Sequence, residues 1–163
     1  GKQFGEGAWV KYFSASAAEL DKKLIAERKV DLAAITEAAR KQLEAEEGIA
    51  VAYTRAEIVG NSRAGAPFFD QLRKSWNAER SSDIQYALKP YWIMTSNSTT
   101  HGSPHPYDTH VPIVFYGPAC IGAGRVDTRV EEADVAPTIA RLLGIPPPAA
   151  AEGKPLPLTP PAR

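Results

Sequence analysis

A continuous apolar segment at residues 111–116 constrains the fold of this chain more than any other feature of its sequence. It directly follows a polar segment, residues 99–110, that contains all three histidines of the protein. A strand that is apolar at successive positions, and not only at alternate ones, is typical of a sheet covered on both faces. We therefore expect residues 111–116 to form a buried strand, with the histidine segment as a loop before it.

The composition is that of a globular chain without a strong charge preference. Of its 163 residues 44% are hydrophobic, and 19 basic residues balance 19 acidic ones. This balance lacks the positive footprint of a nucleic-acid-binding domain, and no apolar run is long enough to span a bilayer. The single cysteine, Cys120, excludes an internal disulfide. The length fits one domain, or one large piece of a bigger domain.

Strand and helix signals alternate over the first ninety residues, which is typical of an α/β or α+β layered fold. Asp31 is the expected N-cap of the clearest helix, and Thr54 begins a capping box with Glu57. Tyr91 and Trp92 lie in an apolar strand pattern and are expected in the core. The expected elements are a strand near residues 8–13, helices over 17–28 and 32–47, a strand over 49–53, a helix near 67–77 and a strand over 84–94 bent at Pro90.

The last third of the chain contains one further helix signal. We expect a short strand over residues 126–130 and then a helix over 135–143, with Asp134 as its cap and Gly144 as its end. The tail that follows is rich in proline, so it is expected to be extended and to have little regular structure.

The histidine loop is the candidate site on residue chemistry alone, because neutral imidazole is the commonest metal ligand among side chains. His101 is followed by Gly102, and glycine permits backbone conformations that other residues avoid. Two interpretations of His101 stay open from the residues: a metal ligand, or a loop histidine bonded to backbone groups.

The other polar side chains of the loop have different expectations. His105 lies between two prolines and is expected to be exposed to solvent. His110 is expected to make a hydrogen bond that orients a ligand, and not to bind a metal directly. Asp108 is expected either to orient a ligand or to be a turn residue. Tyr107 is expected to pack against other side chains and not to take part in catalysis.

Three separated motifs resemble a known family. In chain order they are HGSP at residues 101–104 with YDTHVP at 107–112 and FYG at 115–117, DVAPTIARLLGIP at 134–146, and GKPL at 153–156. Together they resemble the C-terminal signature of the alkaline phosphatase superfamily. The branch they resemble most is that of the zinc-dependent bacterial alkaline phosphatases related to type I phosphodiesterases and nucleotide pyrophosphatases.

The resemblance implies an α/β fold, namely a portion of an alkaline-phosphatase-like α/β/α sandwich with a smaller α+β lobe. Residues 1–90 would form the α+β lobe and connecting elements, and residues 91–163 the C-terminal part of the core. The resemblance also implies a periplasmic or secreted hydrolase.

The resemblance implies one site residue with a specific role. In that family aspartates and histidines hold two zinc ions, a Thr or Ser is the nucleophile, and the last metal ligand is the histidine of the His-Gly pair, here His101. Motifs for the other ligands, the nucleophile and the phosphate contacts are not found in this sequence. No catalytic residue is therefore assigned, substrate-binding residues stay unknown, and Asp108 and His110 are candidates for orienting the ligand.

The function implied is the C-terminal part of a zinc metallohydrolase. The enzyme would cleave phosphate monoesters through a covalent phospho-Thr or phospho-Ser intermediate that forms on residues upstream. Alternatives are a phosphodiesterase or nucleotide pyrophosphatase of the same superfamily, a sulfatase-like or phosphopentomutase-like relative with a different metal, and a non-catalytic accessory binding domain. The expected partners are a phosphate ester and the remainder of the same catalytic domain, with no nucleic acid and no membrane span.

Overall fold

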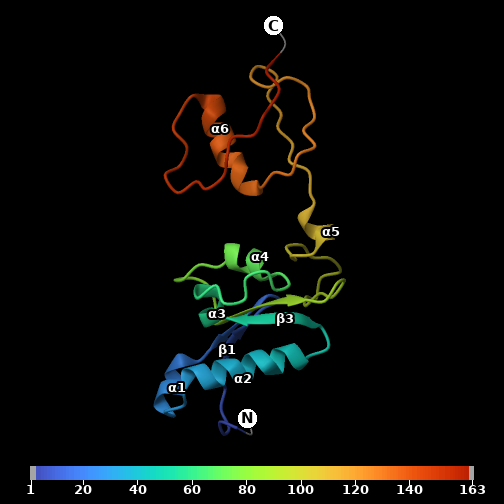
Figure 1. Ribbon diagram of the computed structural model, residues 1–163. Coiled ribbons are helices and arrows are strands. Elements are labelled where there is room, and N and C mark those ends of the chain that lie inside the picture. The colour runs from blue at the N-terminus through green and yellow to red at the C-terminus, as the bar shows by residue number, and fades with distance from the viewer. Residues whose placement is uncertain (1–2, 162–163) are drawn as a thin grey trace. The chain divides into compact units, whose positions relative to one another are not determined.

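The protein divides into two compact units. A computed structural model describes residues 3–161 (Figure 1), and the two units are Gly1–His110 and Val111–Arg163. The histidine loop lies wholly in the first unit. The predicted boundary at residue 90, between an α+β lobe and the C-terminal part of the core, stays a prediction.

A four-stranded antiparallel sheet forms the centre of the first unit. Its strand order is β1-β2-β4-β3, so β4 lies between two strands that precede it in the sequence. Ile84, at the start of β4, pairs with Ala18 on one side and with Thr54 on the other. The strands are β1 (Val10–Phe13), β2 (Ala17–Leu20), β3 (Ile49–Thr54) and β4 (Ile84–Leu88).

Helices cover both faces of this sheet. Figure 1 shows α2 on one side and α4 on the other. Ala52 belongs to the apolar cluster that includes residues of α2, whereas its neighbour Tyr53 belongs to the cluster with Phe69 of α4. This division follows from the strand geometry, because successive side chains point to opposite faces. The helices are α1 (Lys22–Glu27), α2 (Leu32–Ala45), α3 (Arg55–Val59) and α4 (Phe69–Lys74).

A buried arginine lies on the sheet side of α2. Arg40 is only 8% exposed and forms ion pairs with Glu37 at 2.6 Å and Glu44 at 2.7 Å. The hydrogen bond from Arg40 holds the pKa of Glu37 below its usual value. Glu44 also accepts the backbone N–H of Ala52 at 3.3 Å. The charge of Arg40 is therefore compensated where it is removed from water, and the same network joins α2 to β3.

The helices with clear capping signals are confirmed. The side chain of Asp31 accepts the N–H of Ala34 at 2.7 Å at the start of α2. At α3, the hydroxyl of Thr54 accepts the N–H of Glu57, and the Glu57 carboxylate accepts the N–H of Thr54. Both contacts span three residues, which is why the sequence predicts them.

Three expected elements of the first unit differ from the structure. The helix predicted over residues 17–28 is wrong in its first half, because residues 17–20 pair with β1 and β4 as β2 and Asp21 is the N-cap of α1. The helix predicted near residues 67–77 is shorter, because Phe68 has a φ of 59° and α4 begins after it. The strand predicted over residues 84–94 ends at Leu88, two residues before Pro90, which cannot donate to a strand ladder.

Asp83 fixes the junction of β2, β4 and α3. The buried side-chain carboxylate of Asp83 accepts the backbone N–H of Leu20 at 3.0 Å and pairs with Lys22 at 2.9 Å. The backbone carbonyl oxygen of Asp83 accepts the N–H of Arg55 at 2.7 Å. We expect Asp83→Ala to lower the free energy of unfolding in urea by about 2 kcal/mol, because a buried N–H loses its charged acceptor. The matched variant Lys22→Ala is expected to cost less than about 1 kcal/mol, since the Lys22 side chain is half exposed. Equal losses in the two variants would contradict this account.

The second unit is organised around a single helix and the tail. A 3₁₀ turn (Glu132–Asp134) leads into α6 (Val135–Leu143), and Gly144 ends α6 with a φ of 67°, as predicted. The proline-rich tail contains no helix or strand over its described residues, which also agrees with the prediction. Its buried Leu156 donates a backbone N–H to the hydroxyl of Thr138 at 2.8 Å.

Asp134 has a different role from the predicted one. Its side chain caps no N–H of α6 and instead accepts the backbone N–H groups of Glu131 at 2.9 Å and Lys154 at 2.7 Å. The bond from Glu131 is the main reason that the pKa of Asp134 lies below its usual value. Asp134 thus ties the tail to the turn before α6.

The strand predicted over residues 111–116 is wrong for this structure, and so is the short strand over 126–130. Val111, Val114 and Tyr116 are 62%, 84% and 92% exposed. An apolar strand of this type needs sheet neighbours and cover on both faces. Among the described residues none pairs with residues 111–116 as a strand, and within this range only Ile113 and Phe115 are partly buried.

Candidate functional site

The segment that leads into the histidine loop begins where β4 ends. After Leu88 the chain forms no helix or strand until the short helix α5 (Pro106–Thr109). His105 is the N-cap of α5, and its carbonyl oxygen accepts the N–H groups of Asp108 at 2.9 Å and Thr109 at 3.0 Å. The loop is thus attached to the sheet at one end and ordered by a single helical turn at the other.

His101 is exposed, and its ring takes part in no hydrogen bond that the structure records among the described residues. Gly102 has a φ of 95°, which confirms the expected unusual backbone at this position. A Cβ atom added to Gly102 would meet nothing within 4 Å. Glycine is therefore needed here for the backbone conformation and not for space.

Asp108 closes the loop beside His101. Its Oδ2 accepts the backbone N–H of Ser103 at 2.6 Å. This hydrogen bond is the main cause of a lowered pKa of Asp108, and the nearby His101 lowers it further. The carboxylate is therefore an anion at neutral pH that acts on the backbone next to His101.

The prediction that His105 is exposed is wrong. Its side chain is only 5% exposed, and its Nε2–H donates to the carbonyl oxygen of Leu88 at 2.8 Å. The ring packs edge-on against Phe68, with centroids 4.8 Å apart, and stacks on Tyr107 at 5.3 Å. The flanking prolines do not reveal this, because the burial comes from Phe68 and Leu88, which are distant in sequence.

The remaining loop residues lie nearer the surface. His110 is exposed at the C-cap of α5, where its backbone N–H donates to Pro106 at 3.3 Å. Tyr107 packs as expected, stacked on Tyr91 at 4.9 Å, and its hydroxyl accepts the N–H of Tyr91 at 3.0 Å. The expectation that Tyr91 and Trp92 lie in the core is wrong, since they are 84% and 44% exposed.

The described residues of this chain can supply one ligand of a metal site but not a complete site. Within residues 3–161, no three side chains of His, Cys, Asp or Glu come together as a metal-binding group. His101 nevertheless offers an exposed imidazole that makes no recorded hydrogen bond to the described residues, and imidazole nitrogen suits zinc. A metal held by His101 would need its other ligands from residues outside this chain.

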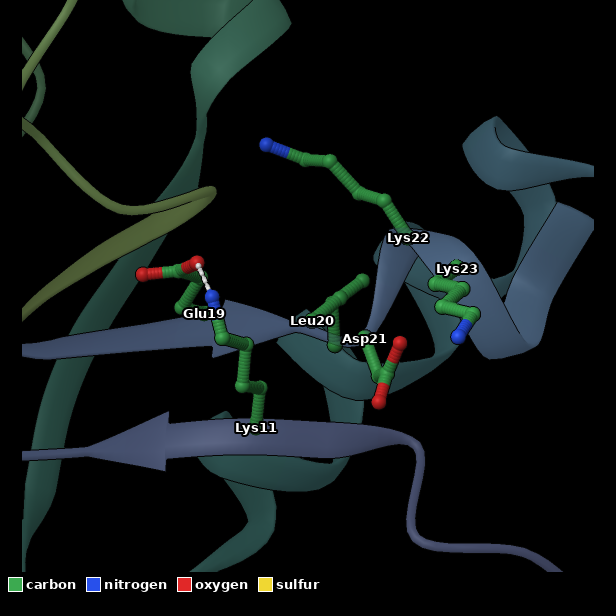
Figure 2. A pocket seen from close by; sticks show the side chains of 6 residues that line it. All are labelled: Lys11, Glu19, Leu20, Asp21, Lys22 and Lys23. Carbon is green, nitrogen blue, oxygen red and sulfur yellow. Dashed lines mark hydrogen bonds and ion pairs between the residues drawn. The ribbon is translucent and has the colours of Figure 1, made fainter.

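A hollow on the surface of the first unit does not compete with the histidine loop as a candidate site. Figure 2 shows the six side chains that line it, three of which are lysines. All three lysines have acidic partners, so their charges are not free to bind an anion. The pairs are Lys11 with Glu19 at 3.1 Å, Lys22 with Asp83 at 2.9 Å and Lys23 with Glu27 at 3.9 Å.

Comparisons with known proteins find relatives that match most of this chain. A protein named calcium-transporting ATPase from Myroides odoratus is 31% identical over 146 residues, which are 88% of this chain and 26% of that protein. Alkaline phosphatase PafA from Elizabethkingia meningoseptica is 30% identical over 138 residues, 83% of this chain and 25% of that protein. No protein-family model matches the chain.

A solved structure matches nearly the whole chain. The crystal structure of wild-type alkaline phosphatase PafA has a TM-score of 0.85 and 27% identity, over 95% of this chain and 30% of that chain. This match confirms the predicted fold class. The chain spans about a quarter of the length of the curated relatives it matches. Within residues 3–161, no helix combines the length and the apolar character needed to cross a membrane.

Proposed function

Since this chain belongs to the alkaline phosphatase superfamily and corresponds to a C-terminal portion of such an enzyme, we propose that it is part of a zinc metallohydrolase that cleaves phosphate monoesters. The observation that carries the proposal is the placement of His101. Its exposed imidazole lies beside Gly102, at a φ of 95°, in a loop that Asp108 closes. His101 is the single metal ligand that we assign to this chain.

The chain's own residues would hold and orient that ligand. The ring of His101 presents a nitrogen, and the bond from Ser103 to Asp108 keeps the neighbouring backbone in place. The exposed His110, at the end of α5, is a second candidate for orienting groups at the site. When bound, paired zinc ions supply a lowered pKa for the nucleophile and stabilisation of the attacking and leaving oxygens. The Thr or Ser that would carry the covalent phosphate lies outside this chain.

The remainder of the same catalytic domain is the proposed macromolecular partner. Val111, Val114 and Tyr116 are exposed here although their pattern is that of a strand covered on both faces. The relatives are more than three times as long as this chain. Residues from that additional length would provide the sheet neighbours and cover that residues 111–116 lack. A periplasmic or secreted location belongs to the same proposal.

The names of the relatives favour a monoesterase over the alternatives. Both PafA and the further relative PhoV of Synechococcus elongatus are named alkaline phosphatases. No observation on the described residues favours a phosphodiesterase, a sulfatase-like enzyme or an accessory binding domain, so we do not propose these.

The full-length protein tests the proposal through its metal content and its substrate preference. We expect about two zinc ions per chain, as in paired-metal phosphoryl transfer, and faster hydrolysis of p-nitrophenyl phosphate than of bis-p-nitrophenyl phosphate. Removing the metal with a chelator should abolish the activity, and adding zinc should restore it. Faster hydrolysis of the diester, or full activity after complete metal removal, would contradict the proposal.

A further inference from the structure

We propose that His105 is a positioning residue that attaches the loop of His101 to the end of strand β4. The inference rests on the proposed function of His101 as a metal ligand. It concerns a side chain for which neither the motifs nor the names of the relatives give a role.

The burial of His105 is unusual for its part of the chain. Between Ala87 and Pro137, a stretch that the structure describes throughout, it is the only buried residue. Burying a polar ring costs free energy unless its polar atoms find partners. The Nε2–H of His105 has such a partner in the carbonyl oxygen of Leu88, the last residue of β4. The loop is therefore attached to the sheet through one specific hydrogen bond.

Aromatic rings pack in series at His105. We call the group formed by Phe68, Tyr91, Tyr107 and His105 the aromatic clasp. Phe68 meets His105 edge-on with an interplanar angle of 73°, and Tyr107 stacks on His105 at 10°. Tyr91 stacks on Tyr107 in turn, at 12°. Three segments that are separate in sequence thus meet at the ring of His105.

Two members of the aromatic clasp have a strained backbone. Phe68 has a φ of 59° and Tyr91 a φ of 65°, values that are rare for bulky residues. Such conformations persist only where the surrounding structure over-determines them, and they gather at functional sites. The contacts of these two rings with His105 and Tyr107 would be lost if the backbone relaxed. The strain therefore points to a function for the clasp beyond covering apolar surface.

Two hydrogen bonds in series join His105 to Ser103, close to His101 in the sequence. The carbonyl oxygen of His105 accepts the N–H of Asp108 and so sets the first turn of α5. The carboxylate of Asp108 accepts the N–H of Ser103 at 2.6 Å. Ser103 is two residues from His101, and Gly102 between them has the unusual backbone. A fixed position of the His105 ring would therefore help to fix the direction in which the side chain of His101 projects from the loop.

The test uses three variants of the full-length enzyme. His105→Phe keeps the ring volume and removes the donor to Leu88, whereas His105→Gln keeps an N–H donor. Thr138→Val is the matched control, because Thr138 is fully buried, its hydroxyl accepts the N–H of Leu156 at 2.8 Å, and it lies in the second compact unit. Each variant is assayed for zinc affinity by chelator competition, for the visible spectrum of the cobalt-substituted enzyme and for thermal stability.

We expect His105→Phe to weaken zinc binding ~10–100-fold, the usual effect of losing a group that orients a ligand. Its cobalt spectrum should change, and amide exchange of residues 101–108 should become faster in the metal-free enzyme. His105→Gln should recover most of the affinity. Thr138→Val should lower the melting temperature and leave zinc affinity and the cobalt spectrum unchanged, so a general loss of stability is distinguished from a loss of positioning.

Three outcomes would overturn the inference in distinguishable ways. If His101→Ala loses zinc while a folded His105→Phe keeps wild-type affinity and spectrum, only the role of His105 is wrong. If His101→Ala keeps full zinc, the proposed function falls and the role of His105 falls with it. If His105→Phe does not fold, Tyr107→Ala replaces it, because Tyr107 is half exposed and this change removes the ring that stacks on His105. Unchanged zinc affinity and unchanged amide exchange in Tyr107→Ala then count against the clasp.

Discussion

We expect His101→Ala in the full-length enzyme to remove the proposed protein ligand of a bound zinc, to weaken metal binding and to lower kcat/KM by far more than the ~10–100-fold typical of an orienting residue. The reason is that a ligand nitrogen at about 2.0–2.1 Å places the metal itself. The fold should stay intact, because His101 is exposed and its ring makes no recorded hydrogen bond within the described residues. Zinc stoichiometry, steady-state kinetics and a thermal melt check the three parts of this prediction.

Two further variants provide a comparison for the result of His101→Ala. Ser98→Ala changes an exposed residue three positions before His101 and should behave as wild type. His110→Ala should give an intermediate loss, since His110 is a candidate for orienting the ligand. Full zinc and full activity in His101→Ala would show that the ligand has been assigned to the wrong histidine.

Residues 1–163 expressed alone should show no hydrolysis of p-nitrophenyl phosphate above background, even with added zinc. The described residues bring no three potential metal ligands together, and one imidazole does not hold a catalytic zinc. No motif for the nucleophile is found in the sequence. The assay needs a far-UV circular dichroism spectrum of the same sample, so that inactivity of a folded chain is distinguished from failure to fold. Zinc-dependent turnover by the purified piece would contradict the prediction.

Local contacts were predictable from the sequence. The N-cap Asp31, the capping box of Thr54 with Glu57 and the end of α6 at Gly144 all depend on groups a few residues apart. The three motifs and their order also indicated the family. The glycine that follows His101 has a positive φ, as expected, whereas the role of His101 as a ligand stays a prediction.

The strand pairing of the sheet could not be predicted from the sequence as the local contacts were. Residues 17–20 read as the first turn of a helix, but they form β2 because β1 and β4 offer them backbone partners on both sides. Ile84 pairs with Ala18 and Thr54, and no local pattern announces pairings between residues so far apart. Helix propensity is a weak preference that such tertiary contacts override.

The sequence by itself determined the capped helices, the family and the histidine that we assign as a ligand, because each depends on neighbouring residues or on a motif. Only the tertiary structure decided that His105 is buried and bonded to Leu88, and that Val111, Val114 and Tyr116 are exposed. The physical reason is the same in both cases. Burial depends on which distant groups surround a side chain: Phe68 and Leu88 cover His105, whereas no described part of this chain covers Val114.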